Sequence, residues 1–231
     1  MKMPKVFISA GHGGKDPGAI GNGFQEKDLT LVISKYCAKA LKRCGVQYKM
    51  SRTTDVEIGV NETVSMCNKY KPDVAVAIHL NAFNKEAIGT EVYCSMFSQN
   101  GRTLATYVLN NITPLGVKSR GVKTKSNSSG GDYFGFIRET EAPAILVECC
   151  FIDSTDIKFV NTKAKQKAMG EAIAKGICEY LNVKYITEQT TVKAPAKLYR
   201  VQVGAFAEKE NAENLLKQLK EKGFNGFITE G

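Results

Sequence analysis

The sequence predicts an α/β fold, a twisted and mostly parallel sheet flanked by helices, followed by a small βαβ C-terminal segment. Short apolar runs such as VAVAI at 74–78 and AILV at 144–147 are typical of strands buried on both faces, as in parallel sheets. These runs alternate with segments whose apolar residues recur at helical spacing, which indicates parallel strands joined by crossover helices. A polar, threonine-rich stretch then predicts a linker, so we divide the chain into domains 1–182 and 198–231, with a linker at 183–197.

The first half of the large domain is expected to alternate strands with helices. The strands are expected over 5–10, 46–51 and 74–79, and the helices over 28–44 and 58–70. A glycine-rich loop at 11–23 follows the first strand. Asp28 is the expected N-cap of the first helix, Gly45 its stop signal, and Pro72 closes the second helix.

The second half of the large domain continues the alternation. The strands are expected over 90–95 and 144–148, and the helices over 100–113 and 163–181. Residues 117–136, which include KSRGVKTKSNSSGGDYFG, are too polar and glycine-rich for a core element. We therefore predict a loop-rich stretch there.

The segment after the linker has the pattern of a single βαβ unit. Residues 198–204 alternate like a half-exposed strand, 208–222 form an amphipathic helix ended by Gly223, and 224–229 suit a second strand. A fragment this short buries too little apolar surface to be securely stable alone.

The composition excludes some classes of protein. The chain is 43% hydrophobic and 24% charged, which is ordinary for a globular protein, and no window approaches the roughly 18 apolar residues of a membrane span. The start, MKMPKVFISAGHGG, lacks the long apolar run and cleavage site of a signal peptide, so we expect synthesis in the cytosol. The 7 cysteines are scattered without a C-x-x-C pair, which predicts reduced, mostly buried thiols.

The formal net charge of +9 favours an anionic partner. Nucleic acid, an anionic membrane or a bacterial wall polymer would qualify, and a solubilising charge without a specific partner is the simplest alternative. Nucleic-acid binding would need basic residues clustered with exposed aromatic side chains. Since the only basic cluster lies at 118–125, we expect no nucleic-acid partner.

Polar side chains follow three of the predicted strands. His12 comes after VFISAG, His79 after VAVAI and Glu148 after AILV, and these are the only 2 histidines of the chain. Ligand sites of open parallel α/β sheets lie at the carboxyl ends of the strands, so we expect these side chains to meet along one edge. Glu26 follows in the loop after the first strand, on the same side.

Two imidazoles and one carboxylate are a common ligand set for catalytic zinc, with the fourth position left for water. A second carboxylate beside that water can act as general base and then as general acid. The simpler alternatives are hydrogen-bonded structural histidines and, for Glu26, a helix-terminal charge. Glu148 is costly at the end of an apolar run unless it is exposed, paired or functional. The absence of H-E-x-x-H excludes a zincin-type helix site.

At this point the sequence resembles a known family, the zinc-dependent N-acetylmuramoyl-L-alanine amidases of the amidase-3 type. The resemblance covers residues 5 to 182 in the family's order. It is carried by SAGHGGKDPGAIG, QEKDLTL, SRTTD, NKYKPDVAVAIHLNA, GTEVY, SRGVK and PAILVECCFID. It implies a twisted, mostly parallel sheet flanked by helices. The implied reaction is hydrolysis of the amide that joins the muramic acid lactyl group to L-alanine in peptidoglycan.

The resemblance also implies roles for individual residues. The ligands of one Zn²⁺ per chain would be His12, Glu26 and His79, and the catalytic acid/base would be Glu148. Glycines around the first histidine would let a bulky glycan-peptide approach the backbone.

Three further residues are candidates for substrate binding. Asn81 is either a hydrogen-bond donor beside the site or a turn residue after the strand. Arg120 and Arg138 are candidates to pair with stem-peptide carboxylates, because a guanidinium forks onto a carboxylate. Solvated surface arginines are the alternative.

The sequence departs from the family pattern in two places. The helix after SRTTD, EIGVNETVSMCNKY, lacks an arginine that the family usually has. The glycine–phenylalanine pair that often follows the catalytic glutamate is replaced by Cys149, Cys150 and Phe151. These departures bear on substrate preference more than on the reaction. The two cysteines could be additional soft ligands, but buried thiols are favoured because three ligands are already present.

The tail RVQVGAFAEKENAENLLKQLKEKGFNGFIT resembles the first half of a SPOR domain, a module that binds glycan strands stripped of stem peptides. Half of such a sheet leaves an exposed strand edge. We therefore expect either weak self-association or a disordered tail.

The leading hypothesis is a cell-wall amidase that acts after release. It would be either a phage endolysin that needs a holin or a mother-cell autolysin of sporulation. A zinc peptidase or deacetylase is the second enzyme hypothesis. A wall-binding protein with a decayed metal site is the non-enzymatic one, and the presence of Glu148 with all three ligand residues counts against it.

Overall fold

The structure is a computed structural model that describes residues 3–188 and 201–229. The chain divides into two compact units, Met1–Glu188 and Gln189–Gly231. The boundary falls inside the predicted linker, whose remaining part, 189–197, lies outside the described residues together with 198–200 of the predicted strand. The two units are described separately.

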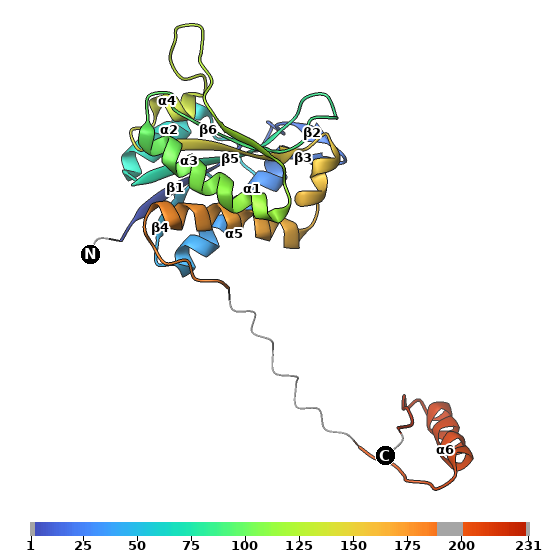
Figure 1. The fold of residues 1–231 in the computed structure, drawn as a ribbon. Helices are drawn as coiled ribbons and strands as arrows, with labels where there is room; N and C mark the ends of the chain where they lie inside the picture. The colour runs from blue at the N-terminus through green and yellow to red at the C-terminus, as the bar shows by residue number, and fades with distance from the viewer. Residues whose placement is uncertain (1–2, 189–200, 230–231) are drawn as a thin grey trace. The chain divides into compact units, whose positions relative to one another are not determined.

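The first unit contains a six-stranded sheet with the order β4-β1-β5-β8-β6-β7. The strands are β1 (Lys5–Ala10), β4 (Gln47–Met50), β5 (Val74–Asn81), β6 (Thr90–Cys94), β7 (Ser119–Lys123) and β8 (Ala144–Phe151). All neighbouring pairs are parallel except β6 and β8, which are antiparallel. The predicted fold class, a mostly parallel sheet flanked by helices, is confirmed (Figure 1).

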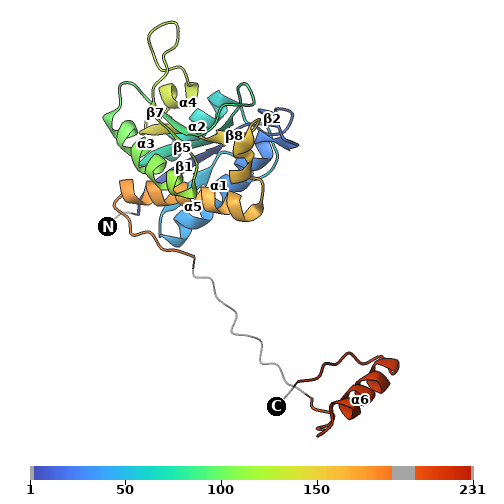
Figure 2. The same cartoon turned by 45° about the vertical axis from the view of Figure 1, so that its right-hand side comes forward.

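Helices cover the two faces of the sheet unequally (Figures 1 and 2). One layer contains α1 (Glu26–Arg43), α3 (Gln99–Ile112) and α5 (Lys163–Tyr180), and the other contains only α2 (Val60–Tyr70) and the short α4 (Gly135–Glu139). Two 3₁₀ turns, η1 (Thr113–Leu115) and η2 (Thr155–Phe159), complete the unit with the small β2–β3 hairpin (Ile20–Gly21 and Phe24–Gln25). We call the first face the closed face and the second the open face.

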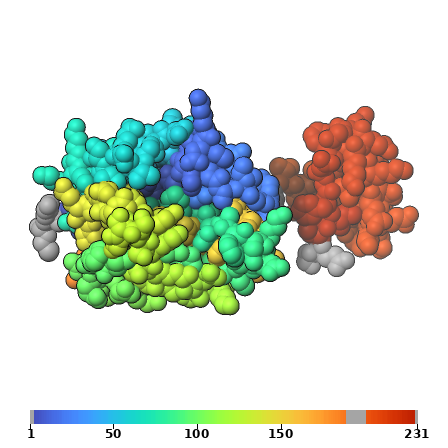
Figure 3. Space-filling view, turned by 90° about the horizontal axis from the view of Figure 1, so that it is seen from above, coloured from blue at the N-terminus to red at the C-terminus, as the bar shows by residue number. Residues whose placement is uncertain are grey.

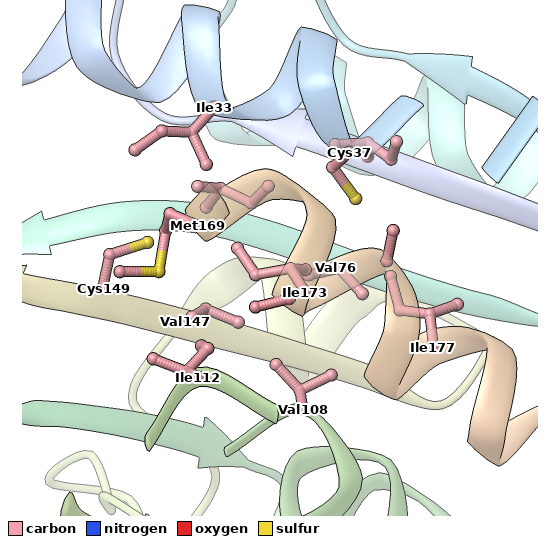
Figure 4. Close-up of a cluster of buried hydrophobic side chains, with 14 of the residues drawn as sticks. Ile33, Cys37, Val76, Val108, Ile112, Val147, Cys149, Met169, Ile173 and Ile177 are labelled. Carbon is pink, nitrogen blue, oxygen red and sulfur yellow. The ribbon is translucent and has the colours of Figure 1, made fainter. Parts of the chain in front are cut away.

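The closed face contains the main hydrophobic core. Figure 4 shows Ile33 of α1, Val108 of α3 and Ile173 of α5 packed near Val76 and Val147 of the sheet. All five side chains are fully buried. Alternate strand residues point the other way, where Phe7, Ala77 and Leu146 form a smaller cluster with α2 and α4. Because those two helices are short, the open face is left uncovered toward the carboxyl ends of β5 and β8.

The structure corrects three predictions in the first unit. Asp28 is not the N-cap, because α1 begins at Glu26 after Gln25 and the cap lacks a side-chain hydrogen bond. The stretch 117–136, predicted to be loop-rich, contains β7 and the start of α4, and the predicted loop 11–23 contains β2. An edge strand such as β7 has only one neighbour and stays half exposed, so its polar composition concealed it.

Residues 183–188 of the predicted linker pack on the first unit. Val183 and Tyr185 contact the closed-face core, and Ile186 N donates to Cys44 Sγ at 3.2 Å. Glu188 pairs with Lys39 of α1 at 2.7 Å and also with Lys167 of α5.

The second unit contains the predicted helix, α6 (Lys209–Glu221), and the expected stop residue Gly223 follows its end with a φ of 85°. The described parts of the two predicted strands, residues 201–204 and 224–229, form no strand. No residue of 201–229 is buried, and Val201 and Phe227 are 86% and 77% exposed. Isolated βαβ segments lack the additional strands that would stabilise the pairing. In the described residues, no helix has the length and apolar character that a membrane span requires.

Candidate active site

The glycine-rich loop after β1 brings His12 and His79 together. His12 has a φ of 60°, a left-handed conformation that turns the chain sharply after the strand. A Cβ on Gly11 would lie 2.4 Å from Cε1 of His79. A Cβ on Gly18, whose φ is +64°, would lie 2.6 Å from both Glu26 Oε2 and His12 Cδ2. Glycine is therefore required at both positions for the rings and the carboxylate to approach.

Glu26 lies between the two histidines. It is the first residue of α1 and is only 3% exposed. Its carboxylate accepts hydrogen bonds from the backbone N–H groups of Ala19, at 2.8 Å, and Leu80, at 2.9 Å. Its oxygens also lie 3.2 Å from His12 Nε2 and 3.0 Å from His79 Nδ1.

The three side chains form a cluster that could hold a metal ion. One donor atom of each lies within 4.8 Å of the other two. Burial alone would raise the pKa of Glu26, but hydrogen bonding to His12 and His79 outweighs it and holds that pKa far below the usual range. The hydrogen bond to Glu26 in turn raises the pKa of His12 to about 9.

Glu148 lies beside this cluster on the open face. It is directly opposite His79 in the register of β5 and β8, so the two side chains project from the same face. Oε2 of Glu148 is enclosed and has no hydrogen-bond partner within residues 3–188 and 201–229. Burial raises the pKa of this carboxyl to about 7. Both His79 and Glu148 lie within their strands, since β5 continues to Asn81 and β8 to Phe151.

Two of the predicted substrate-binding residues, Asn81 and Arg120, lie in a network around Glu91 of β6. Asn81 Nδ2 donates to Glu91 Oε1 at 2.9 Å, and Arg120 Nε donates to Oε2 at 2.6 Å. Glu91 is itself opposite Glu148 in the antiparallel pair of β6 and β8. The network therefore borders the same part of the open face.

The third predicted substrate-binding residue, Arg138, lies on α4. Its Nη1 donates to the backbone carbonyl oxygens of Asp132, at 2.7 Å, and Tyr133, at 3.2 Å, and its Nε pairs with Glu139 at 2.7 Å. The structure thus places Arg138 against the loop before α4 and not in the histidine cluster. In Figure 3 this yellow segment, the cyan segment of α2 and the blue glycine-rich loop surround a hollow on the open face.

Sequence reasoning did not identify two residues that support the cluster. Asp16 Oδ2 lies 2.7 Å from His12 Nδ1, and a carboxylate four residues after a candidate ligand is a usable signal for this contact. Arg52, 3% exposed, donates to the carbonyl oxygens of Ala10, Gly11 and Lys27 and so fixes the loop from behind. Nothing in SRTTD alone predicts those partners.

The cysteines behave as predicted. All seven are free and buried, and burial is the main cause that raises the pKa of Cys149 and Cys150. Neither belongs to the candidate metal cluster.

The ligand-type side chains lie at the carboxyl ends of parallel strands, where open α/β folds place their active sites. The sequence profile of the N-acetylmuramoyl-L-alanine amidases matches residues 6–179, and that of the SPOR domain matches residues 180–230. The chain belongs to the N-acetylmuramoyl-L-alanine amidase family, and the resemblance stated from its motifs is confirmed.

Several relatives are similar over most of the chain. A sporulation-specific N-acetylmuramoyl-L-alanine amidase of Bacillus subtilis is 31% identical over 98% of this chain and 84% of its own length. The endolysin of Bacillus phage SPP1 is 34% identical over 78% of this chain and 66% of its own.

Solved structures show the same architecture. Cwp6 from Clostridium difficile superposes with a TM-score of 0.76 at 36% identity, covering 78% of this chain and 30% of that one. The catalytic domain of CwlV from Bacillus (Paenibacillus) polymyxa superposes with a TM-score of 0.72 at 29% identity, covering 79% of this chain and 100% of that one.

Proposed function

We propose that the chain hydrolyses the amide between N-acetylmuramic acid and L-alanine in peptidoglycan, with one zinc ion held by His12, Glu26 and His79 and with Glu148 as the acid/base. The observation that carries this proposal is the convergence of three ligand atoms within 4.8 Å, next to a carboxylate oxygen that has no partner in the described residues. Membership of the amidase family supports the substrate.

The residues of the cluster fit zinc in their chemistry. Two imidazole nitrogens and one carboxylate are a common protein ligand set for catalytic zinc. The contact of Asp16 with the other ring nitrogen of His12 matches the carboxylate that usually orients a ligating histidine. A zinc ion bound there would supply Lewis acidity for the attacking water and the scissile carbonyl.

Glu148 supplies the proton chemistry in this proposal. Its Oε2 atom is enclosed and has no protein donor to compete for it in the described residues. With a pKa raised to about 7, it is basic enough to take a proton from the attacking water and acidic enough to return it to the departing alanine amine.

The three predicted substrate-binding residues differ in whether their polar groups are exposed or already hydrogen-bonded within the protein. Arg120 keeps part of its side chain exposed, at 35%, so we retain it as a direct contact to the stem peptide. Asn81 and Arg138 bond to Glu91 and to backbone carbonyls respectively, and we assign them the shaping of the site's walls.

The tail and the setting complete the proposal. The SPOR match supports binding of glycan strands stripped of their peptides, and the apolar side chains exposed around α6 support weak self-association. We propose action on the cell wall after release. The sporulation-specific relative aligns with 98% of the chain, which favours a mother-cell autolysin over a phage endolysin.

The decisive experiment measures zinc content and wall lysis on the same sample, before and after chelation. One zinc per chain, with lysis lost on chelation and restored by zinc, supports the metalloenzyme. New L-alanine amino termini on an unshortened stem peptide then identify the amide bond. A shortened peptide would indicate a peptidase instead, and a freed sugar amine a deacetylase. Absence of both zinc and lysis would leave a wall-binding protein.

A further inference from the structure

Glu91 is a buried charged residue that the mechanism above does not use. It is only 2% exposed, and it lies in a row across the open face with Glu148 and His79, since each is opposite the next in strand register. Directly opposed like charges destabilise a sheet, so a carboxylate beside Glu148 needs a compensating reason.

Four donors satisfy the Glu91 carboxylate. Asn81 Nδ2 and the Tyr93 hydroxyl donate to Oε1, each at 2.9 Å. Arg120 Nε and Lys123 Nζ donate to Oε2 at 2.6 and 2.5 Å. Burial alone would raise the pKa of Glu91, but the hydrogen bonds from Lys123, Arg120 and Tyr93 outweigh it and lower that pKa. Glu91 is therefore a fixed anion that holds two cations.

The two cations are not fully used by Glu91. One carboxylate neutralises one positive charge, so the pair leaves one in excess. About a third of each side chain is exposed, 35% for Arg120 and 34% for Lys123. Lys123 Nζ has no second partner in the described residues, and Arg120 uses only Nε and Nη1 as donors there. The guanidinium also lies over the Phe151 ring, 5.0 Å from its centroid, which restricts where it can point.

We infer that Glu91 is a positioning residue that presents Arg120 and Lys123 as a subsite for a carboxylate of the stem peptide. The inference rests on the proposed amidase function. The ligand has to be an acceptor, because both cations have only donors to offer, and an anion fits the excess charge.

The spacing of the sheet indicates where that carboxylate lies in the substrate. Glu91 is two strands from His79, on the order of 10 Å at the usual strand separation. An extended peptide rises about 3.3 Å per residue. The subsite therefore reads an acidic residue about two to three positions beyond the scissile bond, on the amine side.

The test compares two synthetic muropeptides that differ only in that position, one with a free carboxylate and one with its carboxamide. The wild-type chain is expected to show a KM about tenfold lower for the free carboxylate, with kcat within twofold for the two substrates. The readout is the ratio of the two KM values. If Glu91 had a purely structural role, its loss would change KM for both substrates by the same factor and leave the ratio unchanged.

Three variants locate the effect. Lys123→Met removes one charge at a partly exposed side chain and is expected to bring the KM ratio close to one. Lys123→Arg keeps the charge and is expected to keep most of the KM preference for the free carboxylate. Glu91→Gln is expected to lower the ratio in the same way, because the cations lose their anchor. Lys35→Met, on exposed α1 surface of the closed-face layer, makes the same change in net charge and should leave the ratio at its wild-type value.

The two proposals fail in distinguishable ways. Hydrolysis of both muropeptides with equal KM by the wild-type chain would overturn the subsite and leave the amidase intact. A ratio that survives Lys123→Met and Glu91→Gln would overturn the assignment to these residues. Absence of any new L-alanine amino terminus would instead overturn the proposed function.

Discussion

The closed and open faces of the sheet are built from alternate residues of the same strands, yet they differ in what they bury. On β5 and β8, Ile78 and Val147 are fully buried under the α1–α3–α5 layer, while their neighbours His79 and Glu148 point to the half-covered side. The closed face supplies the apolar burial that stabilises the unit. The open face can therefore hold polar groups that folding alone would disfavour.

The difference teaches that stability and chemistry are separated by a single residue step along each strand. Changes on the closed face should reduce the free energy of unfolding and leave the chemistry of the folded fraction unchanged. Changes on the open face should do the reverse. Five measurements break or sharpen that comparison.

The largest effect is expected for His79→Ala on the open face. Removing the ring takes away one of the three proposed ligand atoms, so we expect the loss of both bound zinc and wall lysis. Elemental analysis and a turbidity assay on the purified variant measure the two, with Lys35→Ala as an exposed control. A full zinc content in His79→Ala would show that the ligand set is different.

Glu148→Gln is expected to lower kcat by about 10²- to 10⁴-fold while zinc stays bound. This is the rate enhancement that general acid–base catalysis typically contributes. Near-normal turnover would remove Glu148 from the mechanism.

The same variant tests stability on the open face. Because the pKa of Glu148 is raised to about 7 in the fold, its favourable contribution is present at low pH and is lost as the pH rises through about 7. The metal-free Glu148→Gln chain should thus be no less stable than wild type at pH 8 in urea unfolding. A clear loss of stability there would contradict the separation of the two faces.

Ile173→Ala tests the closed face. This α5 side chain is fully buried, and its truncation should lower the free energy of unfolding by about 2–5 kcal/mol. The folded fraction should keep its zinc and a kcat within a few-fold of wild type. Urea unfolding and kcat at low temperature check both, and a selective loss of zinc would show that the two faces are coupled.

The smallest effect is a pH dependence of metal affinity. In the metal-free chain the pKa of His12 is raised to about 9, chiefly by its hydrogen bond to Glu26, so metal must displace one proton below that pH. Affinity should fall about tenfold for each unit of pH between 9 and 7. Competition with a chromogenic chelator measures it, and a flat profile would mean that His12 is neutral before the metal arrives.

Much of this arrangement could be predicted from the sequence. The apolar runs at 74–78 and 144–147 identified the central strands, and the polar residues that follow them identified His79 and Glu148. The carboxyl ends of parallel strands lie at the same edge of a sheet. The fold class therefore predicted that His79 and Glu148 would lie close together.

Other parts depend on tertiary contacts that leave no local pattern. The polar edge strand β7 is stabilised by its pairing with β6, not by its own composition. Arg52 acts through backbone carbonyls of two distant segments, and Glu91 becomes notable only when four donors converge on it. In the tail the sequence pattern predicted too much structure. Its strand-like alternation has no partner strand in residues 201–229, so the strands do not form there.

The backbone N–H groups of Ala19 and Leu80 that hold the Glu26 carboxylate have a consequence for how the protein would acquire the proposed zinc ion. In a zinc finger the metal drives folding, and the metal-free peptide is disordered. Here main-chain contacts already orient Glu26, one of the three proposed ligands, so we expect the chain to fold and persist without metal. Zinc availability would then act as an on-switch for a finished protein, and depletion would silence it reversibly without exposing it to degradation as an unfolded chain.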